Sequence, residues 1–445
     1  MIRGEIVGQI WRVARLAGPV ALAELGWMAM NTVDIIMVGQ LGPAAIGAIG
    51  VGGNAFYSLA IFGMGLLLGL DTLVSQSHGA GNRADTHRSL AQGVYAAFLI
   101  ALPLMILFRF VPPIFDLLRI NPEVSALAGP FLLALSWSTL PLLLYGAFRR
   151  YLQGIGHVRP VMLTLISANV VNWFFNWLLI PRLGVVGSAL STCLARVYMA
   201  GVLLFFVWWF ERGEEAGFRS LLRTPDMQRM ARLLGIGFPA ATQILLEIGA
   251  FGAAGILAAR LAPVALAAHQ IALSCAAVSY MVPLGISSAA AVSVGQAVGR
   301  REPVAARRSG FIALGLALVF MSCSALAFWF LPQPILRIYT SDARVLESAG
   351  GLLAIAAFFQ LFDGVQTVAT GALRGIGETR VPMLVNLGGY WMLGLPVGYL
   401  LCFHAGRGVQ GLWWGLTLAL IAIALILLYS WDRHSRTIPA YKLTE

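Results

Sequence analysis

Long apolar runs separated by short polar segments recur along the whole chain. Each run is long enough for a helix to cross the ~30 Å hydrocarbon core of a membrane, which takes about 20 residues. The runs are continuous and do not alternate as barrel strands do, so we expect helices to satisfy the backbone. The pattern predicts an all-α integral membrane protein with twelve transmembrane helices. We place the spans at residues 13 to 38, 46 to 72, 92 to 112, 126 to 148, 160 to 181, 186 to 210, 233 to 259, 266 to 292, 309 to 331, 349 to 372, 382 to 402 and 410 to 431.

Composition supports this interpretation: 59% of the 445 residues are hydrophobic, 11% are charged, and the mean hydropathy is +0.82. A water-soluble domain of this length does not have such values. The first run carries Glu24 and Asp34 and lacks an early A-x-A cleavage site, so we interpret it as a span and not a signal peptide. The four cysteines lie in apolar spans without the short spacing of metal ligands, which indicates core residues.

The basic residues predict the orientation of the chain. If both termini are cytoplasmic, that side holds 22 of the 30 Lys and Arg residues, the opposite side holds 7, and Arg196 lies inside the sixth span. Lys and Arg collect in cytoplasmic loops. We therefore expect both ends in the cytoplasm. The same bias explains the net charge of +11, so we expect no nucleic-acid partner.

A polar central segment divides the chain into two predicted lobes. It covers residues 211 to 232, which we interpret as a cytoplasmic linker. Six predicted spans precede it in residues 1 to 210, and six follow it in residues 233 to 431. Residues 432 to 445 form a predicted cytoplasmic tail.

The two lobes share a repeated sequence. LQGIGHVRPVML from residue 152 matches LRGIGETRVPML from residue 373 at seven of twelve positions, an offset of 221. QLGPAAIGAIG from residue 40 parallels RLAPVALAAHQ from residue 260, an offset of 220. Because each half has an even number of spans, the copies are parallel repeats. Parallel repeats around a central cleft are typical of transporters that work by alternating access.

Acidic side chains inside the predicted spans are the first candidates for function: Glu24, Asp34, Glu247 and Asp363. An ionised side chain at the bilayer centre costs at least ~2.5 kcal/mol, so such residues usually face a cavity and have a role. Three of them have amides one helical turn away, and side chains three or four positions apart share a helix face. These amides are Asn31 for Asp34, Gln243 for Glu247, and Gln360 and Gln366 for Asp363.

The chemistry of these faces suits a small cation. Carboxylate and amide oxygens bind hard cations such as Na⁺, and a carboxylate can instead take a proton. One acid can thus exchange H⁺ or Na⁺ for a cationic substrate. The alternative is a purely structural hydrogen bond between helices, which we favour for Glu24, and we expect Asp71 at the membrane interface.

Three asparagines form a further polar face in the fifth predicted span. Asn169, Asn172 and Asn176 follow one another at helical spacing in SANVVNWFFNWLL. Asparagine in a span can simply join helices by a hydrogen bond of about 0.6 kcal/mol. Three on one face are more than that role needs.

Several motifs resemble the multidrug and toxic compound extrusion (MATE) transporters, most closely the NorM-like branch. They are GFPAATQILLEIGAF, AAHQIAL, FDGVQTVATGALRGIG and YWMLGLPVGYLL, and the resemblance covers essentially the whole chain. It implies a bacterial inner (plasma) membrane antiporter that exports organic, mostly cationic drugs in exchange for Na⁺ or H⁺. We expect a monomer in contact with membrane lipids, without a cofactor.

The resemblance also implies site residues. Asp34, Asn172 and Asn176 correspond to the cation site of the first lobe, where Na⁺ could bind. Glu247 and Asp363 correspond to the acids that couple transport in the second lobe. Pro19 matches a proline at which the first helix is thought to bend, and we interpret it as a hinge.

One position departs from the family pattern. Some Na⁺-linked relatives have a tyrosine one turn before the second acid of the second lobe, where this chain has Phe359. The missing hydroxyl leaves the coupling ion open. Residues near the acids are candidates for drug contact, since aromatic faces attract organic cations. They are Trp27, Met30, Gln243, Phe251, Phe359 and Gln360.

Other classes of protein fit the sequence less well. The chain has no H-E-x-x-H, G-x-S-x-G or G-x-x-x-x-G-K-[ST] motif, so we predict neither an enzyme nor a nucleotide-driven pump. A flippase or exporter of lipid-linked saccharides from a related superfamily is the main alternative. Such proteins bind pyrophosphate with basic cavity residues, and Arg196 is the one Lys or Arg away from the ends of the predicted spans, against four acids.

Overall fold

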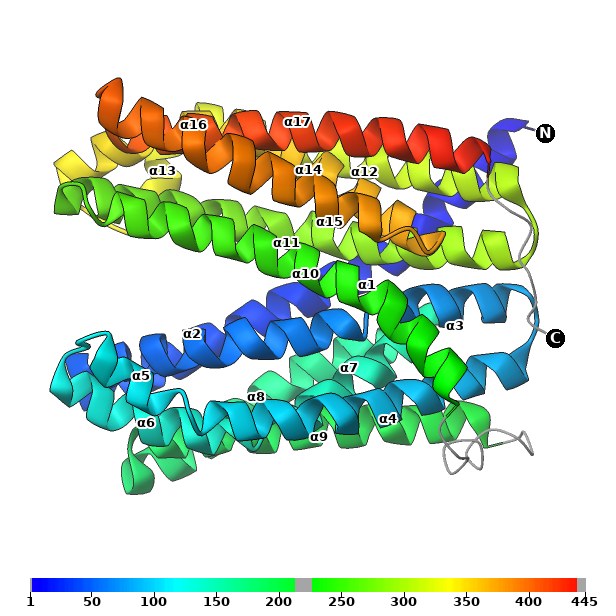
Figure 1. The fold of residues 1–445 in the computed structure, drawn as a ribbon, viewed down its shortest axis with the longest axis horizontal. Coiled ribbons are helices and arrows are strands. Elements are labelled where there is room, and N and C mark those ends of the chain that lie inside the picture. The colour runs from blue at the N-terminus through cyan, green and yellow to red at the C-terminus, as the bar shows by residue number, and fades with distance from the viewer. Residues whose placement is uncertain (1, 213–225, 438–445) are drawn as a thin grey trace. The chain divides into compact units, whose positions relative to one another are not determined.

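A computed structural model describes residues 2 to 212 and 226 to 437, which contain only helices and turns (Figure 1). Eleven described helices, some of them with a short break, are long and apolar enough to cross a membrane, and a pair bent by 47° makes a twelfth span. The bend lies at Trp137 and Ser138, between α6 (Pro122–Ser136) and α7 (Thr139–Gly154). The all-α fold class is therefore confirmed.

The chain folds as two compact units. The N unit contains Leu22–Ala241, and the C unit contains Met1–Ala21 together with Thr242–Glu445. Helices that lie wholly in the N unit are α2 (Pro43–Leu66), α3 (Gly69–Gly79), α4 (Arg83–Phe108), α5 (Pro112–Leu117), α6, α7, α8 (Val158–Leu183) and α9 (Val185–Glu211), with the short η1 (Gly39–Leu41). Those of the C unit are α11 (Pro263–Gly299), α12 (Pro303–Phe330), α13 (Pro332–Leu336), α14 (Ala343–Gly375), α15 (Arg380–Asn386), the π-helical η3 (Leu387–Gly394), α16 (Leu395–Tyr399), η4 (Leu400–His404) and α17 (Gly408–Arg436).

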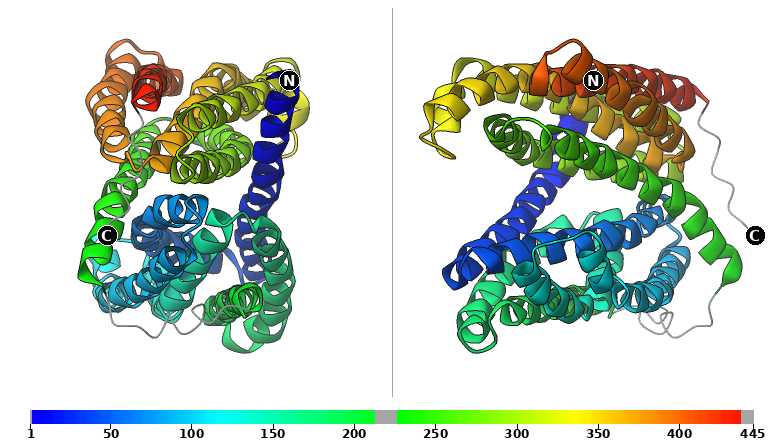
Figure 2. Two further views of the ribbon diagram at one scale, coloured as in Figure 1. Left: turned by 90° about the vertical axis from the view of Figure 1, so that its right-hand side faces the viewer. Right: turned by 60° about the vertical axis from the view of Figure 1, so that its left-hand side comes forward.

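Two long helices belong to both units. The limits between the units fall inside α1 (Ile2–Val38) and α10 (Met227–Ala258), and each helix carries a proline two residues before the limit, at Pro19 and Pro239. Figure 2 shows α1 as one unbroken ribbon. Proline removes one helix hydrogen bond without ending α1 or α10 here. The hinge at Pro19 stays a prediction.

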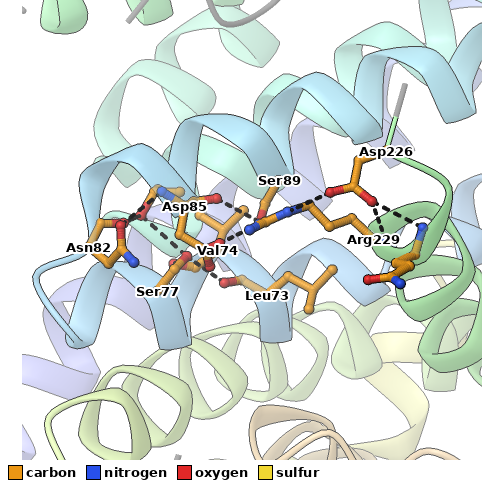
Figure 3. Close-up of polar contacts among 10 residues, drawn as sticks. Leu73, Val74, Ser77, Asn82, Asp85, Ser89, Asp226 and Arg229 are labelled. Carbon is orange, nitrogen blue, oxygen red and sulfur yellow. Dashed lines mark hydrogen bonds and ion pairs between the residues drawn. The ribbon is translucent and has the colours of Figure 1, made fainter. Parts of the chain in front are cut away.

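The division into units differs from the lobes predicted at the central linker. Residues 213 to 225 of that linker and residues 438 to 445 of the predicted tail lie outside the described residues. The start of α10 is nevertheless tied to α4 of the N unit, because Arg229 forms an ion pair with Asp85 (Figure 3). Asp226 caps α10 by accepting the backbone N–H of Arg229 at 3.1 Å.

The backbone preserves the predicted repeat. Gly156 follows α7 with a φ of +88°, and Gly377 follows α14 with a φ of +87°. The Gly156 N–H donates to the carbonyl of Gln153 at 2.9 Å, and the Gly377 N–H donates to that of Arg374 at 2.9 Å. Only glycine adopts this conformation without strain. The two copies of the motif therefore form the same turn.

Helix α14 lies at the centre of the C unit and packs against α11, α12 and α17. Between Leu352 and Gly375, buried residues recur along α14 and include Asp363. In the N unit, α8 and α9 pack along each other, and α9 also contacts α6 and α7. These helices carry the polar residues that surround Asp34.

Candidate functional site

The N unit brings Asp34 together with the asparagines of α8. The Asn176 amide N–H donates to Asp34 Oδ1 at 2.6 Å and to Asn172 Oδ1 at 3.1 Å. The Thr192 hydroxyl of α9 donates to Asp34 Oδ2 at 3.1 Å. The predicted trio is thus assembled around one carboxylate. Thr192 was not predicted, because no spacing within α9 relates it to an acid on α1.

Two polar atoms of this site have no hydrogen-bond partner among the described residues. They are Asn176 Oδ1 and Asn172 Nδ2, and both side chains are fully buried. Asn176 Oδ1 and the Asp34 carboxylate are oxygens of the kind that bind Na⁺. The site therefore has the donor chemistry for a small cation.

Two other predicted members do not join the site. Asn31 is exposed and has no hydrogen bond to Asp34, because the face of α1 that carries Asp34 turns toward α8 and α9. Asn169 donates to the carbonyl of Gly26 at 2.9 Å and so joins α8 to α1. This is the structural role of asparagine in a span.

A buried arginine lies one turn beyond Thr192 on α9. Arg196 is 1% exposed and interacts electrostatically with Asp34. Its guanidinium donates to Ser138 Oγ at 2.5 Å and to the Tyr57 hydroxyl at 3.2 Å. It forms no ion pair with any residue of the described ranges. The positive charge of Arg196 therefore acts on Asp34 without a direct ion pair.

The predicted drug contacts of the N unit are engaged within the protein. Trp27 stacks on Tyr145 at a centroid distance of 6.2 Å, and the Arg196 guanidinium lies 5.8 Å from the Trp27 ring. Met30 is buried in the core. Their contact with drugs stays a prediction.

The other acids of the N unit are ion-paired. Glu24 pairs with Arg149 of α7, which fits the structural role that we favour for it. Asp71 pairs with Arg150 at 3.2 Å and is 1% exposed, and its position at the membrane interface stays a prediction. The arginines follow span four in sequence, and helix packing brings them to acids on α1 and α3.

Glu247 of α10 accepts two amide hydrogen bonds in the C unit. Gln243 Nε2 donates to Glu247 Oε2 at 3.1 Å, and Gln366 Nε2 of α14 donates to the same oxygen at 3.3 Å. The Tyr390 hydroxyl of η3 donates to Gln366 Oε1 at 3.0 Å. Tyr390 thereby fixes the Gln366 amide with its N–H groups toward Glu247.

Asp363 is buried and interacts electrostatically with Glu247. Within the described part of the chain it makes no side-chain hydrogen bond, and neither acid pairs with a basic residue. Gln360, predicted beside Asp363, instead accepts hydrogen bonds from Ser279 and Ser324, each at 3.0 Å. The C unit therefore holds two acids near each other without a basic partner.

Aromatic rings form a cluster in the same unit. Phe251 lies 5.9 Å from Phe359 and 5.8 Å from Tyr390 between ring centroids, and Phe359 lies 5.5 Å from Trp413. Phe359 is 2% exposed, so it packs in the core. Tyr390 supplies the hydroxyl of the cluster from a π-helical turn, a feature common at functional sites. Drug contact by Gln243, Gln360, Phe251 and Phe359 stays a prediction.

The MatE family model matches the chain twice, over residues 19–178 and 239–400. The second match begins at 239, which is 220 positions after the first at 19 and agrees with the repeat offset. The NorM multidrug resistance protein of Burkholderia vietnamiensis is 38% identical and covers 95% of this chain and 93% of its own. A probable NorM protein of Rhodopseudomonas palustris is 36% identical and covers 98% and 93%.

Solved structures of low identity share the fold. The eukaryotic MATE transporter AtDTX14 has a TM-score of 0.86 and 21% identity and covers 97% of this chain and 98% of its own. An outward-facing multidrug resistance MATE transporter of the MOP superfamily has a TM-score of 0.89, 17% identity and 97% coverage of both chains. The double match to the family model and the NorM relatives along nearly its whole length show that the chain belongs to the MATE family, on its NorM-like branch.

Proposed function

We propose that this NorM-type multidrug efflux transporter, which is not an enzyme, is a secondary active antiporter that exports small organic cations in exchange for Na⁺ or H⁺. One observation carries the proposal: Glu247 and Asp363 are buried near each other and neither forms an ion pair with a residue in the described ranges. Two like charges in a medium of low dielectric constant repel, and a bound cation removes the repulsion.

The same acids can serve both the drug and the coupling ion. A drug cation, a sodium ion or a proton would each neutralise negative charge at Glu247 and Asp363. Only one of these cations is needed at a time, so binding of one disfavours binding of the others. Mutual exclusion at a shared site is what an antiporter needs.

In the proposed cycle, a drug cation enters from the cytoplasm while the acids are ionised. External Na⁺ or H⁺ then replaces the drug, and release of this ion to the cytoplasm resets the site. Asp34, with Asn172 and Asn176, would take part through the N unit, and α1 would bend near Pro19. Organic cations would also contact aromatic rings such as Phe251.

The distribution of basic residues and the family relatives support an orientation and a location for the transporter. The excess of Lys and Arg on one side supports cytoplasmic termini, and the bacterial NorM relatives support an inner-membrane location. We expect a monomer among membrane lipids.

Export of lipid-linked saccharides has less support. A pyrophosphate group would need free basic side chains, but Arg149 and Arg150 are paired with Glu24 and Asp71. Arg196 is the one buried arginine of the N unit without a carboxylate partner within the described chain, and it lies beside Asp34.

Ethidium efflux from proteoliposomes tests the proposal. The wild-type protein is energised in turn by an inward Na⁺ gradient and by an inward proton gradient. At least one gradient is expected to drive efflux and so identifies the ion. Asp363→Asn is expected to lower that efflux by at least about tenfold, equivalent to 1.4 kcal/mol.

Asp342→Asn is the matched control. Asp342 begins the same helix, accepts the Arg344 backbone N–H at 2.9 Å and is exposed. Asparagine caps helices as well as aspartate does, so this variant removes one charge without disturbing α14. Efflux that persists in Asp363→Asn would overturn the antiporter proposal. So would a folded wild-type protein in which neither gradient drives efflux.

A further inference from the structure

A cavity of about 720 Å³ lies in the C unit where α12 begins and α17 ends. Its polar wall consists of arginines and its apolar wall of aliphatic and aromatic side chains. The residues that matter here are Arg307, Arg308, Arg436, Val304, Phe311 and Ile312. None of them takes part in the sites around Asp34, Glu247 or Asp363.

Two of the arginines at the cavity share a single carboxylate. Arg307 pairs with Asp432 Oδ1 and Arg436 pairs with Asp432 Oδ2, both at 2.6 Å. One carboxylate thus serves two guanidiniums, each of which has five N–H donors. Glu302, just before α12, is paired with Arg300 at 2.9 Å. The cavity therefore complements an anion, and guanidiniums match phosphate oxygens particularly well.

The apolar wall faces the surface beside these charges. Val304 is 63% exposed and Phe311 is 37% exposed, and the Arg307 guanidinium lies 5.5 Å from the Phe311 ring. A small hydrophilic anion would gain nothing from such a wall. A ligand with a charged head and a long apolar part would cover both walls at once.

The position in the fold indicates the source of that ligand. Both helices are long and apolar enough to span a membrane, and the cavity lies at their ends, where we expect lipid headgroups to meet the protein. Basic cavities between spans at this level bind anionic lipid headgroups. With the orientation proposed above, this is the cytoplasmic leaflet, which is rich in anionic lipid in many membranes.

We propose that this cavity binds the phosphate headgroup of an anionic phospholipid. The N–H groups of Arg307 and Arg436 donate to the phosphate oxygens, and an acyl chain lies along Phe311 and Val304. Binding here does not depend on which ion or drug the transporter carries, so it can fail or succeed independently of the antiport mechanism.

Native mass spectrometry of the purified full-length protein tests the proposal. Phosphatidylglycerol and phosphatidylcholine are titrated separately against the wild type and against Arg307→Gln/Arg436→Gln. The double variant is expected to bind phosphatidylglycerol on the order of tenfold more weakly, with phosphatidylcholine unchanged. Arg337→Gln/Arg344→Gln is the matched control, because it removes two exposed arginines elsewhere in the C unit and should bind as the wild type does.

A second variant is expected to change phosphatidylglycerol binding in the opposite direction. Asp432→Asn releases both guanidiniums from their shared carboxylate and should strengthen phosphatidylglycerol binding several-fold. It keeps the proposal testable if the arginine variant does not fold. Equal phosphatidylglycerol binding by all proteins would overturn the proposal. So would displacement of the lipid by millimolar inorganic phosphate, which would show a site for free phosphate, or equally tight binding of phosphatidylcholine.

Discussion

The two units place opposite charges beside their acids. In the N unit, Asp34 accepts hydrogen bonds from Asn176 and Thr192 and has the buried Arg196 as an electrostatic neighbour. In the C unit, the charged neighbour of Glu247 is a second acid, Asp363. One acid has a fixed positive charge nearby, while the other two have each other.

This difference indicates which site needs a bound cation. A carboxylate beside a guanidinium can stay ionised in a medium of low dielectric constant without a bound cation. Two carboxylates without a basic partner gain from a proton, a sodium ion or a drug cation. On the proposed mechanism, cation exchange is therefore concentrated in the C unit. The N unit site depends less on a bound cation.

The first expected effect concerns the stability of the N unit. Asp34→Asn removes the carboxylate that interacts electrostatically with the buried Arg196, and Arg196→Gln removes that positive charge from the surroundings of Asp34. Each single variant should lower the melting temperature, and the double variant should recover most of the loss. The coupling energy in this cycle is expected to be on the order of 1 to 3 kcal/mol.

Thermal denaturation of the four proteins in the same detergent measures this cycle. Losses that simply add in the double variant would mean that Asp34 and Arg196 do not compensate each other. The contrast between the units would then disappear.

Neutralising both acids of the C unit should have the opposite effect on stability. The variant Glu247→Gln/Asp363→Asn removes the repulsion and leaves at position 247 an amide whose oxygen can still accept from Gln243 and Gln366. Replacing buried charges by neutral groups is often neutral or stabilising by about 1 to 4 kcal/mol. We expect a higher melting temperature at pH 8 together with the loss of driven efflux. A lower melting temperature than the wild type would show that the acids stabilise the fold.

The smallest expected effect sharpens the role of Tyr390. Tyr390→Phe removes the hydroxyl that orients the Gln366 amide toward Glu247, a hydrogen bond of about 1 kcal/mol. The ionised form of Glu247 loses support, so half-maximal efflux should need up to about fivefold more Na⁺, or fewer protons if H⁺ is the coupling ion. The maximal rate should be retained. An unchanged ion dependence would limit Tyr390 to packing.

Tyr399→Phe is the control for this variant. Tyr399 ends α16, just beyond the π-helical turn, and contacts Phe403 and His404 rather than the acids. Its removal should change neither the ion dependence nor the rate.

Much of the site follows from sequence because burial of an acid is visible in a hydropathy pattern. Asp34, Glu247 and Asp363 stand out against apolar neighbours, and the asparagines of α8 share a face. Spacing along one helix identifies Gln243 beside Glu247 correctly. It fails for Asn31, because the neighbours of Asp34 come from other helices.

The missed residues all depend on contacts between helices. Thr192 bonds to Asp34 from α9 and Tyr390 bonds to Gln366 from η3, and no periodicity within a helix encodes which helices pack together. The Glu24 to Arg149 pair was missed for the same reason, although Glu24 itself was interpreted as structural. The turns at Gly156 and Gly377 were predictable, since the repeated motif fixes their glycines.

Equilibrium binding of ethidium to the purified protein tests most directly whether drug and coupling ion exclude each other at the acids of the C unit. Ethidium fluorescence is titrated at increasing Na⁺ concentration and at decreasing pH. We predict that one of these cations weakens binding to the wild type, to Asp342→Asn and to Asp34→Asn, and that this competition is lost in Asp363→Asn. Competition that persists in Asp363→Asn but is lost in Asp34→Asn would contradict the mechanism and place the exchange of cations in the N unit.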